Sequence, residues 1–285
     1  MKRYHEHQIG LGAVFIAAVL WSSGGLLVKL VSFSPMQISF FRCSVAALTF
    51  AVIFKKKVFL FNKLTFLNSF FYAGVLIFYV IAMKTTTAAN AIFLQSTAPI
   101  YVLIFEPIIN KTRHEQANII TIAICFWGMI LFFLGDLEPG QLVGNMFGLL
   151  SGILFAAFFL GMKKNDKKYQ QSSIFFGNIL VALISLPFIF SINELLFTDL
   201  WKVSFLGVFQ IAIAYAFFSY GLKRVVAVEA SIISMVEPVL TPFWVYIGYG
   251  EVPSLTALIG GTIILAVISI RTIQIGRTLF SRRLA

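Results

Sequence analysis

Long apolar stretches separated by short polar segments are the main pattern in this chain of 285 residues. A helix needs about 20 mostly apolar residues to cross the hydrocarbon core of a bilayer. The sequence therefore predicts an all-α membrane protein with ten transmembrane helices and no soluble domain. We place these helices near residues 9–31, 36–54, 64–83, 88–109, 116–134, 142–162, 172–192, 202–221, 226–248 and 254–273.

The composition agrees with this interpretation and changes how the net charge is understood. Hydrophobic residues make up 59% of the chain and charged residues 12%, whereas about 25% of the residues in a soluble domain are charged. In a soluble protein the formal net charge of +11 would indicate binding to nucleic acid. Here the basic residues gather in alternate loops, which is typical of membrane proteins. We expect a lipid bilayer around the chain and no nucleic-acid partner.

The same charge pattern predicts the orientation in the membrane. With the N-terminus in the cytoplasm, the inside segments hold Lys2, Arg3, Lys55, Lys56, Lys57, Lys63, Lys111, Arg113, Lys163, Lys164, Lys167, Lys168, Lys223, Arg224, Arg271, Arg277, Arg282 and Arg283. The predicted outside loops hold Lys84 and Lys202 together with the acids Asp136, Glu138, Glu194, Asp199 and Glu251. Because basic residues favour the cytoplasmic side, we predict a multi-pass protein of the cell (inner) membrane with both termini in the cytoplasm.

The chain also contains an internal repeat. Residues 82–99 match residues 221–238 when shifted by 139 positions, and this shift places Pro99 on Pro238 (238 − 99 = 139). Each half has five predicted helices, an odd number, so the second half enters the membrane from the opposite side. We therefore predict two inverted five-helix repeats, residues 1–138 and 139–285. Such repeats suit a carrier that opens alternately to the two faces of the membrane.

The two matched prolines lie near the middle of their predicted helices. Because proline has no N–H, the carbonyls of Gln95 and Ser234 lose their ordinary helical partners. An unpaired carbonyl in hydrocarbon costs several kcal/mol and is tolerated where it faces a cavity. Paired breaks of this kind indicate the binding site of a transporter. The alternative is a pair of simple kinks whose carbonyls are satisfied by Ser or Thr side chains.

Glu237 precedes the second of these prolines. It lies about 16 Å along a helix that starts near residue 226, close to the middle of the membrane, where an ionisable group is costly and indicates a functional site. Its carboxylate could contact a cationic part of a substrate, or it could gain and lose a proton and so couple transport to protons. The alternative is a buried structural acid paired with Arg42 or with a tyrosine hydroxyl.

Further polar residues near the middle of their helices could line the same cavity, although each could instead form a hydrogen bond between helices. They are Trp21, Ser22, Gln95, Ser96, Gln210 and Tyr215. For Arg42 we expect a partner on another helix. Glu106 and Glu229 lie near helix ends, where they should reach water and serve as anchors. Gly144, Gly148 and Gly152 share one helix face, which indicates close helix packing.

Signals for other chemistry are weak. The sequence has no G-x-x-x-x-G-K-[ST] phosphate loop, so an ATP-driven pump is not expected. His5, His7 and His114 lie outside the predicted helices, which leaves no membrane-embedded zinc site. Cys43 and Cys125 lie inside helices and indicate no disulfide. We expect no enzyme, no cofactor and no metal, and either a monomer or a homodimer.

Several segments resemble a known family. They are Leu20-Trp21 with Lys29, Phe41-Arg42, AMKTTTAANA at 82–91 and GLKRVVAVEASIISMVEPVLTPFWVYIGYGE at 221–251. Over essentially its whole length the chain is similar to the EamA family of the drug/metabolite transporter superfamily. It departs from the family at 105–113, where the first half more often ends in a Gly-Glu like that at 250–251. The resemblance implies ten helices, a central cavity lined by both halves, and secondary transport of small metabolites, often outward.

These observations favour a permease, expected to be an exporter, for small metabolites such as amino acids or related compounds, working by alternating access. One alternative is a flippase for a lipid-linked or amphipathic substrate, which Arg42 alone would favour. Another is a membrane scaffold without transport, which would need neither the midplane acid nor the matched prolines.

Overall fold

The computed structural model describes residues 2–86, 88–110, 116–133, 142–192, 196–249 and 255–281. Within these ranges every regular element is helical and there is no strand. The first half contains α1 (Lys2–Ser22), α2 (Gly24–Leu30), α3 (Pro35–Phe54), η1 (Lys55–Phe59), α4 (Lys63–Thr85), α5 (Ala88–Gln95), α6 (Ala98–Asn110) and α7 (Gln116–Phe133). The second half contains α8 (Leu142–Lys164), η2 (Lys167–Tyr169), α9 (Gln170–Ser185), η3 (Leu186–Ser191), α10 (Phe197–Phe205), η4 (Leu206–Ile213), α11 (Ala214–Leu222), α12 (Ala227–Ser234), α13 (Val236–Tyr249) and α14 (Leu255–Ser281).

Eight helical stretches in the described part of the chain are long and apolar enough to cross a membrane. They are His5–Leu30, Pro35–Phe59, Lys63–Thr85, Asn90–Ile109, Leu142–Lys164, Lys167–Ser191, Phe197–Leu222 and Ala227–Gly248. Two shorter apolar helices, Gln116–Leu131 and Leu258–Ile268, fall in the fifth and tenth predicted spans. The predicted all-helical class is confirmed, and the chain has the helices of a multi-pass membrane protein.

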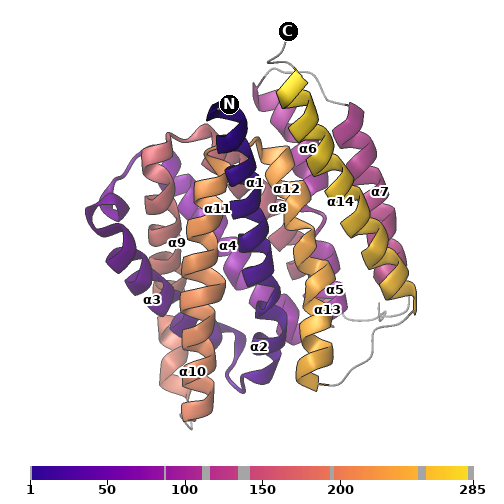
Figure 1. Cartoon of the computed structure of the whole chain (residues 1–285). Helices are drawn as coiled ribbons and strands as arrows, with labels where there is room; N and C mark the ends of the chain where they lie inside the picture. Colours follow the sequence, from indigo (N-terminus) through magenta and orange to yellow (C-terminus); the bar gives the residue numbers. More distant parts are fainter. Residues whose placement is uncertain are drawn as a thin grey trace.

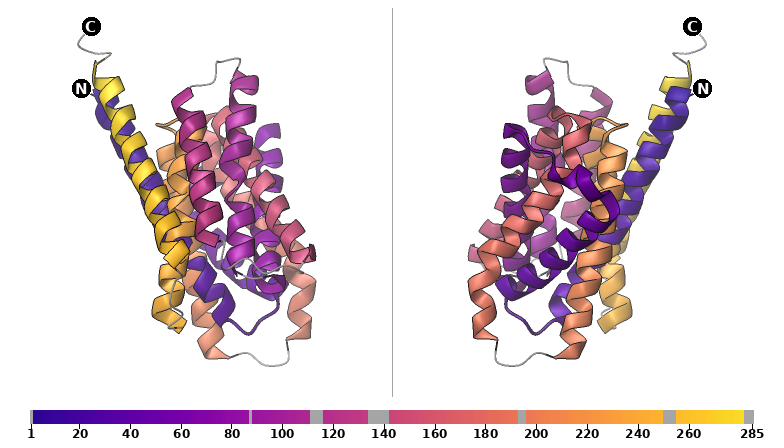
Figure 2. Two further views of the ribbon diagram at one scale, coloured as in Figure 1. Left: turned by 90° about the vertical axis from the view of Figure 1, so that its right-hand side faces the viewer. Right: turned by 90° about the vertical axis from the view of Figure 1, so that its left-hand side faces the viewer.

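Both ends of the chain lie on the same side of the helix bundle (Figures 1 and 2). We call this side the N-terminal end. The predicted inside loops gather there: Lys163 Nζ donates to the Leu222 carbonyl at 3.0 Å, and Asn62 Nδ2 donates to Asn165 Oδ1 at 2.9 Å. Lys84 lies at the opposite end, where its Nζ donates to the Val31 carbonyl at 2.7 Å. The loops therefore alternate in space as the charge pattern predicted.

Some residues used in the sequence argument lie outside the described residues. They are Lys111, Arg113, His114, Asp136, Glu138, Glu194, Glu251, Arg282 and Arg283.

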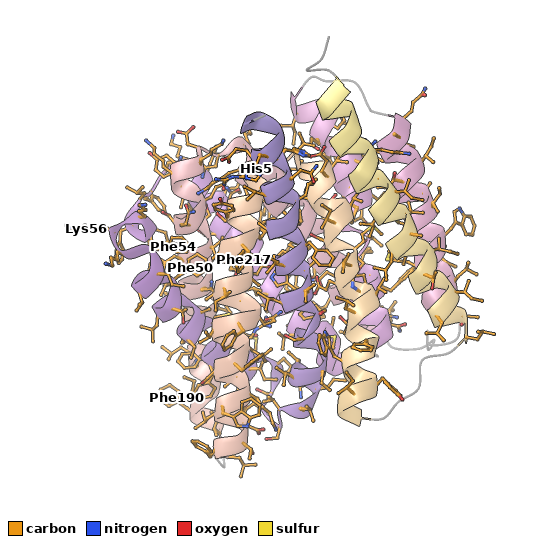
Figure 3. The ribbon with its side chains drawn as sticks, viewed as in Figure 1. His5, Phe50, Phe54, Lys56, Phe190 and Phe217 are labelled. Carbon is orange, nitrogen blue, oxygen red and sulfur yellow. The ribbon has the colours of Figure 1, made fainter. Side chains whose placement is uncertain are left out.

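Large apolar side chains cover the outside of the bundle, while polar ones lie within it. His5 and Lys56 lie towards the N-terminal end, and Phe190, whose exposed fraction is 88%, lies towards the opposite end (Figure 3). Arg42 and Asn178 are fully buried. Apolar side chains outside and polar side chains inside are the arrangement expected where lipid replaces water around the protein.

Two helices are interrupted at matching positions. α5 and α6 are separated by Ser96 and Thr97, and α12 and α13 are separated by Met235. Shifted by 139 positions, the bounds of α5 fall on those of α12, and the last residue of α6 falls on the last residue of α13. Each break comes just before its proline, because proline is tolerated in the first turn of a helix but not in its interior. In Figure 1 the two broken helices run in opposite directions.

The glycines of α8 allow this helix to lie directly against α5. A Cβ added at Gly152 would lie 2.7 Å from the Leu94 carbonyl oxygen and 3.0 Å from that of Gln95. A Cβ at Gly148 would lie 3.2 Å from the Leu94 Cβ. These contacts agree with the predicted packing role. They also place α8 against the carbonyl that Pro99 leaves without its helical donor.

Candidate functional site

Two small cavities meet at the breaks of the two interrupted helices. The first, which we call the proline cavity, is lined by polar residues from both halves of the chain: Gln95, Ser96, Ser231, Ser234 and Glu237, together with Pro99. The second, the arginine cavity, is lined by Trp21, Arg42, Tyr79, Gln210, Tyr215 and again Gln95 and Glu237. Gln95, Phe155 and Glu237 line both cavities, so the two lie side by side, and we call them together the polar centre.

Both cavities are small in this structure. Each cavity has a volume of about 20 Å³, which is room for about one water molecule. Binding sites for small molecules usually enclose roughly 300–1,000 Å³. A metabolite therefore enters only after helices move apart.

Glu237 lies between the two cavities in the first turn of α13, directly after the break at Met235. Its side chain is partly buried. Among the described residues no donor lies within hydrogen-bond distance of its carboxylate, and no ion pair joins it to Arg42 although both line the arginine cavity. The structural alternative required a paired carboxylate. The geometry instead leaves the carboxyl group of Glu237 without a protein partner at the edge of both cavities.

Gln95 and Gln210 come from unusual stretches of helix. Gln95 ends α5 at the break, and its Nε2 donates to Ser151 Oγ on α8 at 2.9 Å. Gln210 lies in η4, which is a π-helix, a rare form that is often found at functional sites. Its Oε1 is buried without a hydrogen-bond donor. No pattern in the sequence indicated this π-helix.

Trp21 and Tyr215 form an aromatic wall of the arginine cavity. Their ring centroids lie 4.8 Å apart, and the Trp21 ring also packs edge-on against Phe155 with centroids 5.6 Å apart. The Trp21 Nε1 is buried without an acceptor. Tyr79 and Phe155 complete the wall. Neither was predicted from the sequence, because an aromatic residue within an apolar run can face either lipid or the interior of the bundle.

Two of the predicted cavity residues lie away from both cavities. Ser22 is fully buried, and its Oγ donates to the Val19 carbonyl at 2.6 Å and accepts from Trp244 Nε1 at 2.7 Å. It therefore forms the hydrogen bond between helices that the sequence left open as its alternative. Pro238 is buried beside Glu237 but points elsewhere, because consecutive helical residues are about 100° apart around the axis.

At the N-terminal end of the bundle, Glu106 joins the two halves of the chain. Glu106 is only 7% exposed, and its carboxylate oxygens accept hydrogen bonds from the backbone N–H groups of Ala227 at 3.0 Å and Val228 at 2.8 Å. The expectation that Glu106 reaches water was wrong. Unsatisfied N–H groups at a helix N-terminus attract a carboxylate, and the start of α12 lies beside the end of α6. Glu229 pairs instead with His7, whose Nε2 lies 2.9 Å from Glu229 Oε2.

The opposite end of the bundle has a second group of contacts. Asp199 Oδ2 accepts from the Ser32 N–H at 3.1 Å, and its Oδ1 lies 3.1 Å from Lys202 Nζ. Lys202 also donates to the Leu30 carbonyl at 3.0 Å. Together with the bond from Lys84 to Val31, these contacts hold the α2–α3 connection against α4 and α10. Contacts of Glu106 and of Asp199 thus join the helices at the two ends of the bundle.

We expect Glu106→Gln to destabilise the fold by about 1–2 kcal/mol, because glutamine loses the charge and one of the two acceptors that cap α12. Glu6→Gln is the matched control. Glu6 pairs with Arg224 at 2.7 Å but its side chain is 46% exposed, so its loss should cost less than about 1 kcal/mol. Unfolding of the purified variants in detergent measures both values. Equal effects of the two substitutions would show that Glu106 is no internal cap.

Comparison with known proteins gives a consistent result. The model of the EamA-like transporter family matches residues 8–134 and 142–272. An uncharacterized transporter of Archaeoglobus fulgidus (strain ATCC 49558 / DSM 4304 / JCM 9628 / NBRC 100126 / VC-16) is 28% identical over 257 residues, which cover 90% of this chain and 94% of the relative. The uncharacterized transporter YdfC of Bacillus subtilis (strain 168) is 27% identical over 266 residues, which cover 86% and 84%.

A solved structure, named only "Crystal structure of protein", has the same fold. It matches with a TM-score of 0.77 and 16% identity over 96% of this chain and 98% of that chain. The resemblance found in the sequence is therefore confirmed: the chain belongs to the EamA-like transporter family of the drug/metabolite transporter superfamily and is a multi-pass membrane transporter.

Proposed function

We propose that this protein is a secondary transporter that exports small metabolites, such as amino acids or related compounds, by alternating access. The observation that carries the proposal is the unpaired carboxyl group of Glu237, which lines two small cavities where broken helices of both halves meet. Discontinuous helices around a central site are typical of secondary transporters. The proton is the proposed coupling ion, because Glu237 is the cavity acid able to carry it.

The arrangement of helices supports ten spans in two inverted repeats, residues 1–138 and 139–285. The matching bounds of α5 and α12 and the contact between the end of α6 and the start of α12 are expected if the halves are related by a rotation about an axis in the membrane plane. Inverted halves can exchange conformations. Opening the Glu106 contacts would then expose the centre at one end, and opening the Asp199 contacts would expose it at the other.

For the orientation we propose that the N-terminal end lies in the cytoplasm of a cell (inner) membrane protein. Lys167 is exposed at that end, and Thr85 is exposed at the opposite end. In a chain with Cys43→Ala and Cys125→Ala, we expect Thr85→Cys to react with a membrane-impermeant maleimide in sealed cells. Lys167→Cys should react only after the cells are permeabilised. The reverse pattern would contradict the orientation.

One observation favours the flippase alternative. An apolar groove of about 530 Å³ lies between α1, α3 and α11, lined by residues such as Ile16, Phe54 and Phe217. A lipid chain would fit such a surface. The groove shares no lining residue with the two cavities around Glu237, so transport through the polar centre remains the function that the geometry supports best.

A further inference from the structure

Arg42 is a fully buried charge whose hydrogen bonds are incomplete. Its exposed fraction is 0%, and its Nη2 donates to the Leu76 carbonyl on α4 at 2.8 Å. Its Nε and Nη1 have no protein acceptor. Removing a charge from water is expensive, and leaving its donors unpaired adds to that cost. The expected partner on another helix is the Leu76 carbonyl, and it accepts from one of the three guanidinium nitrogens.

A purely structural arginine in the same fold is different. Arg271 on α14 is 6% exposed, and its Nε and Nη2 both donate to Asn118 Oδ1 on α7 at 3.0 and 2.7 Å. It links two helices through a side-chain acceptor placed for it. Arg42 has no such acceptor, and it lines the arginine cavity. The Nε and Nη1 groups of Arg42 can therefore donate hydrogen bonds to a molecule that enters the cavity.

Other unpaired atoms around the same cavity indicate what would enter. The Trp21 Nε1 is a second buried donor without an acceptor, while the Gln210 Oε1 is a buried acceptor without a donor. Glu237 adds a carboxyl group to the same lining. The cavity thus has a positive charge at Arg42 and unpaired N–H donors at Arg42 and Trp21. A carboxylate would satisfy both.

We propose that Arg42 is the anion-binding residue of the central site, so that the transported molecule carries a carboxylate. This inference rests on the proposed transport function and adds a substrate feature to it. Arginine suits this task because its guanidinium stays charged when buried and offers several N–H donors to carboxylate oxygens. The anion is a water-soluble one, because the arginine cavity shares no lining residue with the apolar groove that faces lipid.

The test uses sodium acetate as the smallest carboxylate, added to purified full-length protein in detergent. A ligand that binds only the folded state raises the melting temperature by mass action. We expect acetate to raise the melting temperature of the wild type above the value in sodium chloride of equal concentration. Arg42→Gln should lose this difference, and Arg42→Lys, which keeps the charge, should retain part of it.

Arg271→Gln is the matched control, because it removes a buried arginine away from the cavities. It should lower the melting temperature but keep the acetate effect. If Arg42→Gln does not fold, the wild type and Arg42→Lys still decide the matter, because a wild type without an acetate effect overturns the proposal. An acetate effect that persists in Arg42→Gln also overturns it. Stabilisation by phosphatidylglycerol but not by acetate would do the same, since the bound anion would then be a lipid headgroup.

The transport proposal is tested separately, by access to the cavity from each side of the membrane. If the chain shows such access but no acetate effect, the anion-binding role of Arg42 is refuted and the transport proposal stands.

Discussion

Glu237→Gln is expected to slow transport by about 10- to 100-fold while the protein still folds and inserts into the membrane. A hydrogen bond to a charged group contributes about 1.5–3 kcal/mol, and each 1.4 kcal/mol is about tenfold in affinity. Glutamine has nearly the same size as glutamate. In this structure no described group bonds to the Glu237 carboxylate, so the substitution leaves no protein group without its partner. The loss should therefore appear in transport and not in stability.

The measurement is exchange of a labelled amino acid in proteoliposomes, with the compound that the wild type exchanges fastest, at pH 6, 7 and 8. Glu237→Asp keeps the charge and should retain part of the rate. Glu229→Gln removes an acid from the N-terminal end and should leave the rate close to that of the wild type. If protons couple transport, the wild-type rate varies across these pH values and the residual rate of Glu237→Gln does not. Normal exchange by Glu237→Gln at all three values would remove Glu237 from the site.

Gly152→Ala is expected to destabilise the fold by about 1–3 kcal/mol, the usual cost of overpacking. The added methyl carbon would lie 2.7 Å from the Leu94 carbonyl oxygen, and a backbone atom cannot turn away as a flexible side chain can. α8 would have to move away from α5, which would also disturb the break before Pro99.

Gly12→Ala is the matched control for this prediction. A Cβ at Gly12 in α1 would meet no atom within 4 Å, so alanine should stabilise its helix by up to about 1 kcal/mol through its higher helix propensity. The two substitutions add the same methyl group and should change the free energy of unfolding in opposite directions. Thermal unfolding in detergent measures both. A Gly152→Ala protein as stable as the wild type would contradict the close contact between α8 and α5.

The spans and the helix breaks could be predicted from the sequence because each depends on a local property. Apolar length determines whether a stretch can cross a membrane, and Pro99 and Pro238 interrupt their own helices wherever those helices pack. The comparison at a shift of 139 positions also matched the segment that forms α5 with the segment that forms α12. Gly152 could be assigned to packing because small residues four apart share one helix face.

The direction of individual side chains could not be predicted in the same way. Ser22 and Trp21 are neighbours near the middle of the first span, yet one binds Trp244 on another helix and the other lines the cavity. Glu106 was expected to reach water because the sequence shows only that it lies near the end of its helix. Its contact with the N-terminus of α12 depends on how the two halves of the chain pack. For Arg42 a partner on another helix was expected, but which of its N–H groups lack an acceptor depends on which carbonyls lie nearby.

The most direct test of the account is whether the polar centre is reached from both sides of the membrane. Ser96 lies at the break before Pro99 and lines the proline cavity. In a chain with Cys43→Ala and Cys125→Ala, Ser96→Cys should react with a membrane-impermeant methanethiosulfonate added to either side alone. Leu48→Cys, at a position on α3 that is 69% exposed on the outer surface, should stay unmodified, because a thiol surrounded by lipid does not form the reactive thiolate. Modification of Ser96→Cys from both sides is the result that alternating access predicts, and modification from one side only, or from neither, would contradict it.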